Sequence, residues 1–149
     1  MLKKFFKKEG LQPVQAAGSK NKKAEVGRLG EQTAEKYLKK KGYRIQERNF
    51  SGRFGEVDII AFKGEALVFI EVKTRSGSGY AAPKEAVDAR KVGRIIKAAY
   101  EYMQRKGLPE DTSVRFDVIG ITTGAEAGAG SVENEEMIIE HIEAAFDAC

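Results

Sequence analysis

The feature that most constrains this chain is a pair of apolar segments separated by a short polar turn. Residues 56–62 and 67–73 are rich in Val, Ile, Phe and Ala, and residues 63–66 (KGEA) lie between them. Such spacing predicts a β-hairpin. The second segment is apolar on both faces until its end, which is typical of an interior strand covered by helices on both sides. Residues 51–55 (SGRFG), just before the hairpin, fit a turn or a mobile loop.

The remaining segments place helices and further strands around this hairpin. Apolar residues recurring at every third or fourth position predict helices at residues 24–41 and 83–106. Strands are expected at residues 43–50 and 114–121. Residues 137–146 fit either an edge strand followed by a turn of helix or a helix throughout. One mixed sheet flanked by helices satisfies this order best, so we predict an α/β fold, a three-layer α/β/α sandwich.

Charge is distributed unevenly along the 149 residues, a length that allows one domain plus tails. Residues 1–23 hold seven lysines against one glutamate, whereas residues 122–149 hold seven acids and no Lys or Arg. We therefore expect a basic, flexible arm at 1–23, one domain at 24–123, a flexible linker at 124–134 and an acidic segment packing on the domain at 135–149.

The basic arm and the net charge of +4 indicate a polyanionic partner. Nucleic acid is the first candidate and an anionic membrane surface, contacted through the arm, is the second. The alternative is that the arm is only a solvated, lysine-rich tail. The longest uninterrupted apolar run, residues 66–70, is far shorter than the ~20 residues that a membrane-spanning helix needs. No secretory signal pattern is found, so we expect a cytoplasmic protein.

Residue counts exclude several kinds of site. The single cysteine, Cys149, cannot form an internal disulfide or a zinc cluster. The single histidine, His141, excludes sites that need two imidazoles, such as H-E-x-x-H. Chemistry in this chain must therefore depend mainly on carboxylates and lysines, with or without a metal ion.

A candidate site lies at the end of the predicted hairpin. If residues 63–66 close it, Asp58 lies opposite Glu71, and Lys73 and Glu56 emerge on the same face, because side chains alternate along a strand. Two facing carboxylates repel and are costly to desolvate, and a divalent cation would relieve both costs. Oxygen ligands favour Mg²⁺ or Mn²⁺. The alternative is that these are ordinary charges at strand ends.

Several segments together resemble a known family. They are GxxGExxAxxYL from Gly27, NF at Asn49, GEVDIIA from Gly55, FIEVKTR from Phe69 and RFD from Arg115, with HI and AF near the C-terminal end. Over residues 24–146 this pattern resembles the YraN-like bacterial proteins. That family is assigned to the PD-(D/E)XK, restriction-endonuclease-like superfamily and is similar in pattern to archaeal Holliday-junction resolvases. Val57 stands where the superfamily name has proline.

The resemblance implies roles for five residues. It makes Asp58 and Glu71 metal ligands, and Lys73 the catalytic lysine. It also makes Glu31 the helix acid that completes the metal site, and Val72 a ligand through its backbone carbonyl.

The activity implied is hydrolysis of phosphodiester bonds by a metal-activated water. DNA is favoured over RNA, with branched and flap structures among the candidate forms. A nuclease that acts on a symmetric junction would suit a homodimer, although no residue in the sequence identifies a dimer interface. The alternative function is a non-catalytic nucleic-acid-binding or assembly protein with the same fold. Candidates for phosphate contacts are Arg75, Lys84, Arg90, Lys91 and Arg94.

Overall fold

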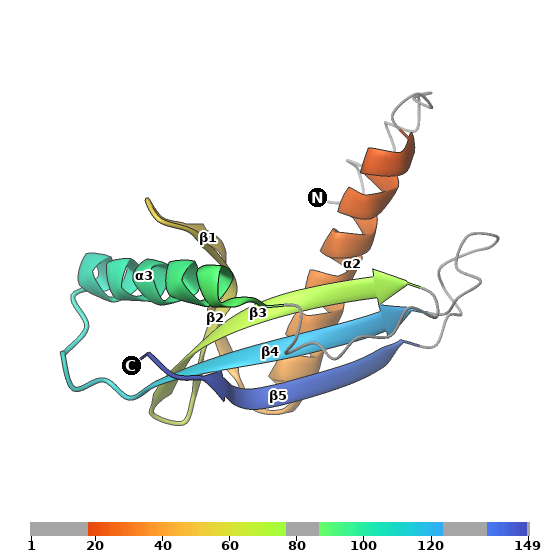
Figure 1. The fold of residues 1–149 in the computed structure, drawn as a ribbon. Coiled ribbons are helices and arrows are strands. Elements are labelled where there is room, and N and C mark those ends of the chain that lie inside the picture. Colours follow the sequence, from red (N-terminus) through yellow and green to blue (C-terminus); the bar gives the residue numbers. More distant parts are fainter. Residues whose placement is uncertain (1–17, 77–86, 124–136, 149) are drawn as a thin grey trace, which may run out of the picture.

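The computed structural model describes residues 18–76, 87–123 and 137–148. Five strands form one mixed sheet in the order β1-β2-β3-β4-β5 (Figure 1). Strands β3 and β4 are parallel, and the other neighbouring pairs are antiparallel. The strands are β1 (Arg44–Ser51), β2 (Glu56–Lys63), β3 (Ala66–Ser76), β4 (Val114–Thr123) and β5 (Ile138–Phe146).

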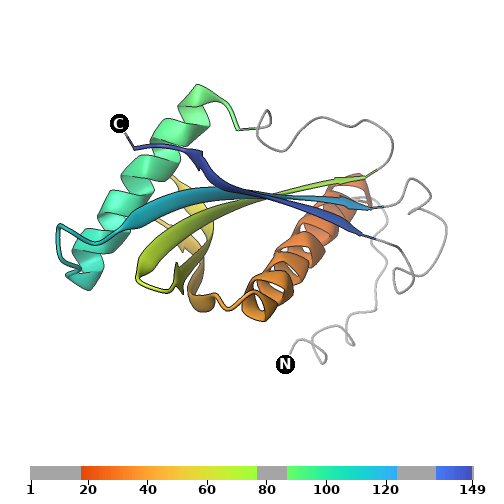
Figure 2. The ribbon, with the colours of Figure 1, turned by 90° about the horizontal axis from the view of Figure 1, so that it is seen from below.

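Two helices cover opposite faces of this sheet (Figure 2). Helix α2 spans Gly18–Lys40 and helix α3 spans Ala89–Lys106. Parallel neighbours need a crossover connection, and α3 lies in the crossover between β3 and β4. The result is the α/β/α sandwich predicted from the sequence, in the restriction-endonuclease-like arrangement of a mixed sheet between helices.

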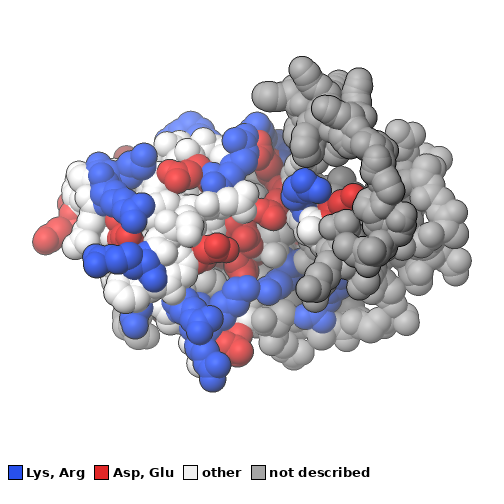
Figure 3. Space-filling model, turned by 90° about the horizontal axis from the view of Figure 1, so that it is seen from above, with Lys and Arg blue, Asp and Glu red and all other residues white. Residues whose placement is uncertain are grey.

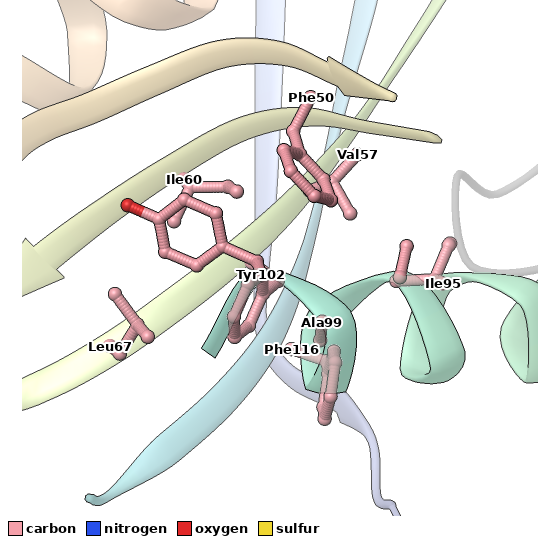
Figure 4. Close-up of a cluster of buried hydrophobic side chains, with 10 residues drawn as sticks. Phe50, Val57, Ile60, Leu67, Ile95, Ala99, Tyr102 and Phe116 are labelled. Carbon is pink, nitrogen blue, oxygen red and sulfur yellow. The ribbon is translucent and has the colours of Figure 1, made fainter. Parts of the chain in front are cut away.

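Helix α3 packs on the sheet through aromatic and aliphatic side chains (Figure 4). Tyr102 of α3 contacts Phe50 and Phe69 edge-on, with ring centroids 5.3 and 6.0 Å away. Ile95 of the same helix is 3% exposed and belongs to the same core cluster. Such burial stabilises the fold by about 1.5–3 kcal/mol per large apolar side chain. This face therefore fixes the position of α3 over β2 and β3.

The opposite face is closed by α2, which buries Ala34 and Leu38 completely. A close approach occurs at Gly30, where a Cβ atom would lie 1.9 Å from Thr74 Oγ1 of β3. Only a residue without a side chain fits there in this arrangement. Gly30 therefore lets α2 run against the end of β3, and it brings the next residue, Glu31, to the border of the sheet.

The predicted hairpin register is confirmed. Ile60 pairs with Phe69 and Phe62 with Leu67, as expected. Lys63 also pairs with Ala66, so the connecting turn consists of residues 64 and 65 and is tighter than the four-residue loop that the sequence suggested. The shorter turn leaves the register unchanged because it adds one more pair of the same ladder.

Other boundaries differ from expectation. Helix α3 begins at Ala89, later than the predicted start at residue 83, because the Asp88 side chain caps it by accepting a 2.9 Å hydrogen bond from the Lys91 N–H. Helix α2 begins at Gly18, so residues 18–23 of the expected basic arm are helical. Residues 1–17 of the arm and the expected linker at 124–134 lie outside the described residues.

The C-terminal segment is an edge strand. For residues 137–146 the helix throughout is wrong, because β5 extends over Ile138–Phe146 and pairs with β4. The edge strand of the other alternative is confirmed, but the turn of helix expected after it is wrong, because the strand continues to Phe146. An irregularity in the ladder near Phe116 accompanies a positive φ of 51° at Ala144. In the described part of the chain, no helix has both the length and the apolar character needed to cross a membrane.

Candidate active site

The end of the β2–β3 hairpin brings two carboxyl groups together. Asp58 follows Val57 on β2, and Glu71 follows Ile70 on β3, just beyond the last paired residues of the hairpin ladder. The Asp58 side chain hydrogen-bonds to that of Glu71 and accepts a second hydrogen bond, 2.8 Å long, from the Val72 N–H. Glu71 is only 4% exposed. The predicted juxtaposition of these two acids is therefore present.

The Asp58 carboxyl binds its proton more tightly than an ordinary aspartate does. Burial, together with repulsion from and a hydrogen bond to Glu71, raises the pKa of Asp58 to about 8, against the opposing hydrogen bond from the Val72 N–H. Sharing one proton is how two neighbouring carboxyl groups avoid two adjacent charges. A divalent cation would serve the same purpose by balancing both charges.

Two lysines face Glu71. The Lys91 ammonium, from the first turn of α3, forms an ion pair with Glu71 Oε2. Lys73 Nζ lies 3.8 Å from the same oxygen. Burial and the neighbouring Lys91 ammonium lower the pKa of Lys73, while Glu71 and Asp58 oppose this shift. A lysine with a lowered pKa beside paired carboxyls is suited to exchanging a proton with a bound water.

The position of Lys91 follows from the way α3 begins. Its N–H is the group capped by Asp88, which sets the first turn of α3 and directs the Lys91 side chain toward β3. Burial alone would lower the pKa of Lys91, but the hydrogen bonds with Glu71 and Lys73 raise it. From the sequence, Lys91 was expected only to contact phosphate, and its direct pairing with Glu71 was not foreseen.

Glu31 reaches the same region from the other side of the sheet. Burial raises its pKa, a hydrogen bond with the Asn49 side chain opposes the shift, and repulsion by Glu71 and Glu56 adds to it. These interactions place Glu31 within electrostatic reach of Glu71. Among the described residues, however, Glu31, Asp58 and Glu71 are not a set whose ligand atoms all lie within 4.8 Å of one another.

Asn49 is a site residue whose role sequence reasoning missed. It has a positive φ of 50°, a conformation that Asn adopts more readily than most residues. It lies on β1 between Arg48, which pairs with Ile59, and Phe50, which pairs with Val57, and this places it across from Asp58. From this position its side chain forms a hydrogen bond with the Glu31 side chain. The only sequence signal was its place in the NF motif of the family pattern.

Asp58 separates two open pockets, each of about 390 Å³. One pocket lies on the α3 side and the other on the α2 side. Figure 3 shows acidic side chains near the middle of a face bordered by Lys and Arg. The α3-side pocket is lined by Phe54, Gly55, Glu56, Asp58, Glu71, Lys91, Arg94 and Ile95. The α2-side pocket is lined by Arg28, Glu31, Gln32, Glu35, Arg48, Asn49, Asp58 and Ile59.

The basic residues expected to contact phosphate have different positions. Arg94 lines the α3-side pocket and is exposed. Arg90 is exposed on the first turn of α3. Arg75 lies near the end of β3, where its carbonyl accepts a 3.4 Å hydrogen bond from the Thr123 hydroxyl. Lys84 lies outside the described residues.

A second polar cluster surrounds Asp117 on β4, on the α2 side of the sheet. Asp117, His141 and Glu143 offer ligand atoms within 4.8 Å of one another, close enough for one metal ion. The fully buried Asp117 already accepts hydrogen bonds from Arg115 Nε, at 2.8 Å, and from His141 Nε2, at 2.7 Å. The Ala144 N–H adds a further bond of 3.0 Å. The partners present thus neutralise this carboxylate, and they attach β5 to β4.

Comparisons with known proteins agree on one family. The model described as "Uncharacterised protein family UPF0102" matches residues 30–121. A UPF0102 protein of Syntrophomonas wolfei is 42% identical over 124 residues, covering 82% of this chain and 97% of that protein. A UPF0102 protein of Trichlorobacter lovleyi is 46% identical over 123 residues, covering 82% of this chain and 90% of the relative.

The matched region contains the whole candidate site. Glu31, Asp58, Glu71, Lys73 and Lys91 all lie within residues 30–121, as does the hairpin that brings the acids together. The motifs on which the sequence resemblance was based lie largely in the same region. This chain therefore belongs to the UPF0102 family, the YraN-like family that its motifs resemble.

Proposed function

We propose that this protein is a metal-dependent nuclease that hydrolyses phosphodiester bonds of DNA. The observation that carries the proposal is the pairing of the half-buried Asp58 carboxyl with the buried Glu71 carboxyl beside Lys73. Buried carboxyls that repel each other are costly to maintain, and such groups cluster at functional sites. Their place at the rim of an open pocket makes them accessible to a substrate.

The donor set fits a hard divalent cation, Mg²⁺ or Mn²⁺. Asp58 and Glu71 would supply carboxylate oxygens, and Glu31 and the Val72 carbonyl would be the further ligands that the family pattern implies. Such an ion, when bound, lowers the pKa of a coordinated water and neutralises charge that develops on the phosphate. The ligand atoms of Glu31, Asp58 and Glu71 do not all lie within 4.8 Å of one another, so these acids would need to move closer together to hold one ion.

The chain's own residues supply the remaining parts of the reaction. Lys73, with its lowered pKa, would orient the attacking water and take up its proton. Arg94 and Arg90 would hold phosphates of the bound strand at the pocket rim, which positions the strand without reading its sequence. Lys91 would move its ammonium from Glu71 toward a phosphate when the cation binds, because both compete for the same oxygen.

Cleavage of a panel of labelled DNAs tests the proposal. The panel holds a single strand, a duplex, a flap and a four-way junction, each with Mg²⁺ or Mn²⁺. The wild type should cleave at least one form, and Asp58→Ala and Lys73→Met should not. Glu65→Gln removes an exposed acid from the other end of the same hairpin and should cleave like the wild type. Absence of cleavage in every form and metal would contradict the nuclease.

One observation favours the alternative of a non-catalytic nucleic-acid-binding or assembly protein. Glu71 is already balanced by Lys91 and Lys73 without any metal. A site of this kind would bind nucleic acid with an affinity that depends on salt but not on EDTA or on Glu71→Ala. Binding with these properties, without cleavage, would support the alternative.

A further inference from the structure

The turn between β1 and β2 presents an aromatic ring at the mouth of the α3-side pocket. Phe54 lines this pocket together with Asp58 and Glu71, yet 53% of its surface is exposed. Single exposed apolar residues are common on protein surfaces and need no function. Phe54 differs from such residues because its turn is fixed in place and because cations surround the ring.

The turn is attached to α3 rather than free in solvent, unlike the mobile loop that the sequence allowed. The Arg53 N–H donates a 2.7 Å hydrogen bond to Glu101 Oε1 of α3. The Gly52 N–H bonds to the Gly55 carbonyl at 2.9 Å, which closes the turn. A Cβ atom at Gly55 would lie 3.1 Å from the Arg94 carbonyl oxygen, so the turn lies directly against the helix backbone. Phe54 is therefore held in a defined place.

Positive charges flank this ring. Lys97 Nζ lies 5.4 Å from the ring centroid of Phe54, and the Arg53 guanidinium carbon lies 5.9 Å from it. Arg94 lines the same pocket. Exposed cation–π contacts are weak, so these cations remain available to phosphate groups. An exposed aromatic ring among cations is the combination that binds single-stranded nucleic acid, since the ring stacks on a base while the cations hold the backbone.

We propose that Phe54 stacks on an unpaired base of the bound strand, at the mouth of the pocket that Asp58 and Glu71 also line. The inference rests on the proposed function and names its substrate class. In a continuous duplex both faces of each base are covered by neighbouring bases, so the ring finds no face to contact. The site therefore takes nucleic acid with unpaired bases beside the cleaved bond, such as a single strand or a flap.

Binding in EDTA, with the full chain, tests this without cleavage. The probes are a single strand and a flap, each with 2-aminopurine in the unpaired segment, and a continuous duplex of the same sequence. Loss of one stacked base should make Phe54→Ala bind the single strand about tenfold more weakly and abolish the 2-aminopurine quenching, with duplex affinity changed less than about twofold. Phe54→Tyr should retain both properties. Tyr100→Ala removes a similarly exposed ring that lies on α3 and does not line this pocket, and it should behave like the wild type.

The outcomes separate this inference from the nuclease proposal. Equal weakening of single-strand and duplex binding in Phe54→Ala, or unchanged quenching, overturns the stacking role even if the wild type cleaves DNA with Mg²⁺. Quenching that depends on Phe54 in a protein that cleaves none of the probes supports the stacking role and counts against the nuclease. Failure of the wild type to bind any probe in EDTA overturns the stacking role, and the cleavage panel with Mg²⁺ or Mn²⁺ then decides the nuclease proposal separately. Unchanged thermal unfolding of Phe54→Ala excludes misfolding as the cause, since the side chain is mostly exposed.

Discussion

Asp58 and Glu71 illustrate, at the scale of single residues, how a site can be prepared at the expense of stability. Asp58 binds its proton more tightly than an ordinary aspartate because it is partly desolvated and lies beside the buried Glu71. Lys91 and Lys73 supply positive charge around the pair. The bound proton and the two ammonium groups each reduce the electrostatic repulsion between the two acids when no metal is bound. A cation that binds both carboxyl groups could take their place.

The first prediction concerns the response of stability to the cation. A ligand that binds only the folded state at 100 times its Kd stabilises by about 2.7 kcal/mol, so saturating Mg²⁺ or Mn²⁺ should raise the melting temperature by roughly 5 to 10 °C. Asp58→Asn and Glu71→Gln should lose this response because they remove ligand oxygens. Differential scanning calorimetry with and without the cation measures it.

Glu65→Gln is the matched control, since it also removes one acid from the hairpin but lies exposed at its turn. It should respond to the cation like the wild type. An equal rise in melting temperature for wild type, Asp58→Asn and Glu71→Gln would mean that the cation binds elsewhere. The Asp117 cluster would then be the first place to examine.

At the scale of elements, β5 depends on one buried carboxylate. Burial alone would raise the pKa of Asp117, but hydrogen bonds from His141, Arg115 and the Ala144 N–H outweigh it, and the pKa lies below its ordinary value. Tyr43 joins this network, since its hydroxyl accepts a 2.6 Å hydrogen bond from Arg115 and donates one of 3.3 Å to Glu143. The edge strand is thus attached to β4 by charge as well as by backbone pairing.

The second prediction follows from this attachment. Removing one partner of a buried ion pair costs about 3–5 kcal/mol, so Asp117→Ala should lower the free energy of unfolding by about that amount. Asp117→Asn keeps the size of the side chain and should lose less. Urea unfolding at neutral pH measures both variants. Asp111→Asn, an exposed change in the loop before β4, serves as the control and should unfold like the wild type.

The same carboxylate predicts a dependence on pH. Its folded-state pKa is lowered, so its contribution to stability is complete above the unfolded-state value of about 3.9 and is lost as the pH falls through the folded-state pKa. The wild type should therefore lose more stability than Asp117→Asn between about pH 4 and pH 2. Equal losses in the two proteins would show that Asp117 is not the group being titrated.

The sequence predicted the hairpin well because its signals are local. A two-residue period and a short polar turn determine which residues pair, and this alone placed Asp58 near Glu71. The start of α3 was predicted too early, because Pro83 is a good first helical residue while the cap that forms is Asp88. The terminal strand stayed ambiguous, since its pairing with β4 is a contact distant in sequence.

Less of the candidate site could be predicted. The pairing of Lys91 with Glu71 depends on how α3 packs across the sheet, which no local pattern reports. The bond between Asn49 and Glu31 depends on a positive φ within a strand. The predicted roles of Glu31 and Val72 come from family resemblance, and they stay predictions.

On the scale of the whole molecule, charge is arranged around the pocket. The chain carries a net charge of +4, with acids in the pocket and basic side chains at its border. Such a distribution attracts a polyanion to the rim and admits cations to the centre. We expect the basic side chains at the border to determine the affinity for nucleic acid. We expect the acids in the pocket to determine whether a bound strand is cleaved.

The fourth prediction tests the rim through salt dependence. Removing one phosphate-binding side chain should reduce the slope of log K against log salt concentration by about 0.7 to 0.9, depending on whether the strand is single or double. Arg94→Gln should therefore weaken binding at low salt similarly for all sequences and flatten this slope. Arg44→Gln, at the far end of the hairpin beside Gly64, should leave the slope unchanged. Fluorescence anisotropy titrations over a range of salt concentrations give both values.

The sheet order has a consequence for the way the chain folds. Every strand pairs with its neighbour in sequence, and β1, β2 and β3 form a meander with short loops. Strands β3 and β4 are parallel, so they can pair only after the long crossover that contains α3 has formed. Contacts between residues close in sequence form faster than distant ones. We therefore expect the two acids to meet early, as the hairpin closes, and Lys91 to reach them only when α3 docks. During folding, the acidic centre would be assembled with Lys73 beside it, before the Lys91 ammonium arrives.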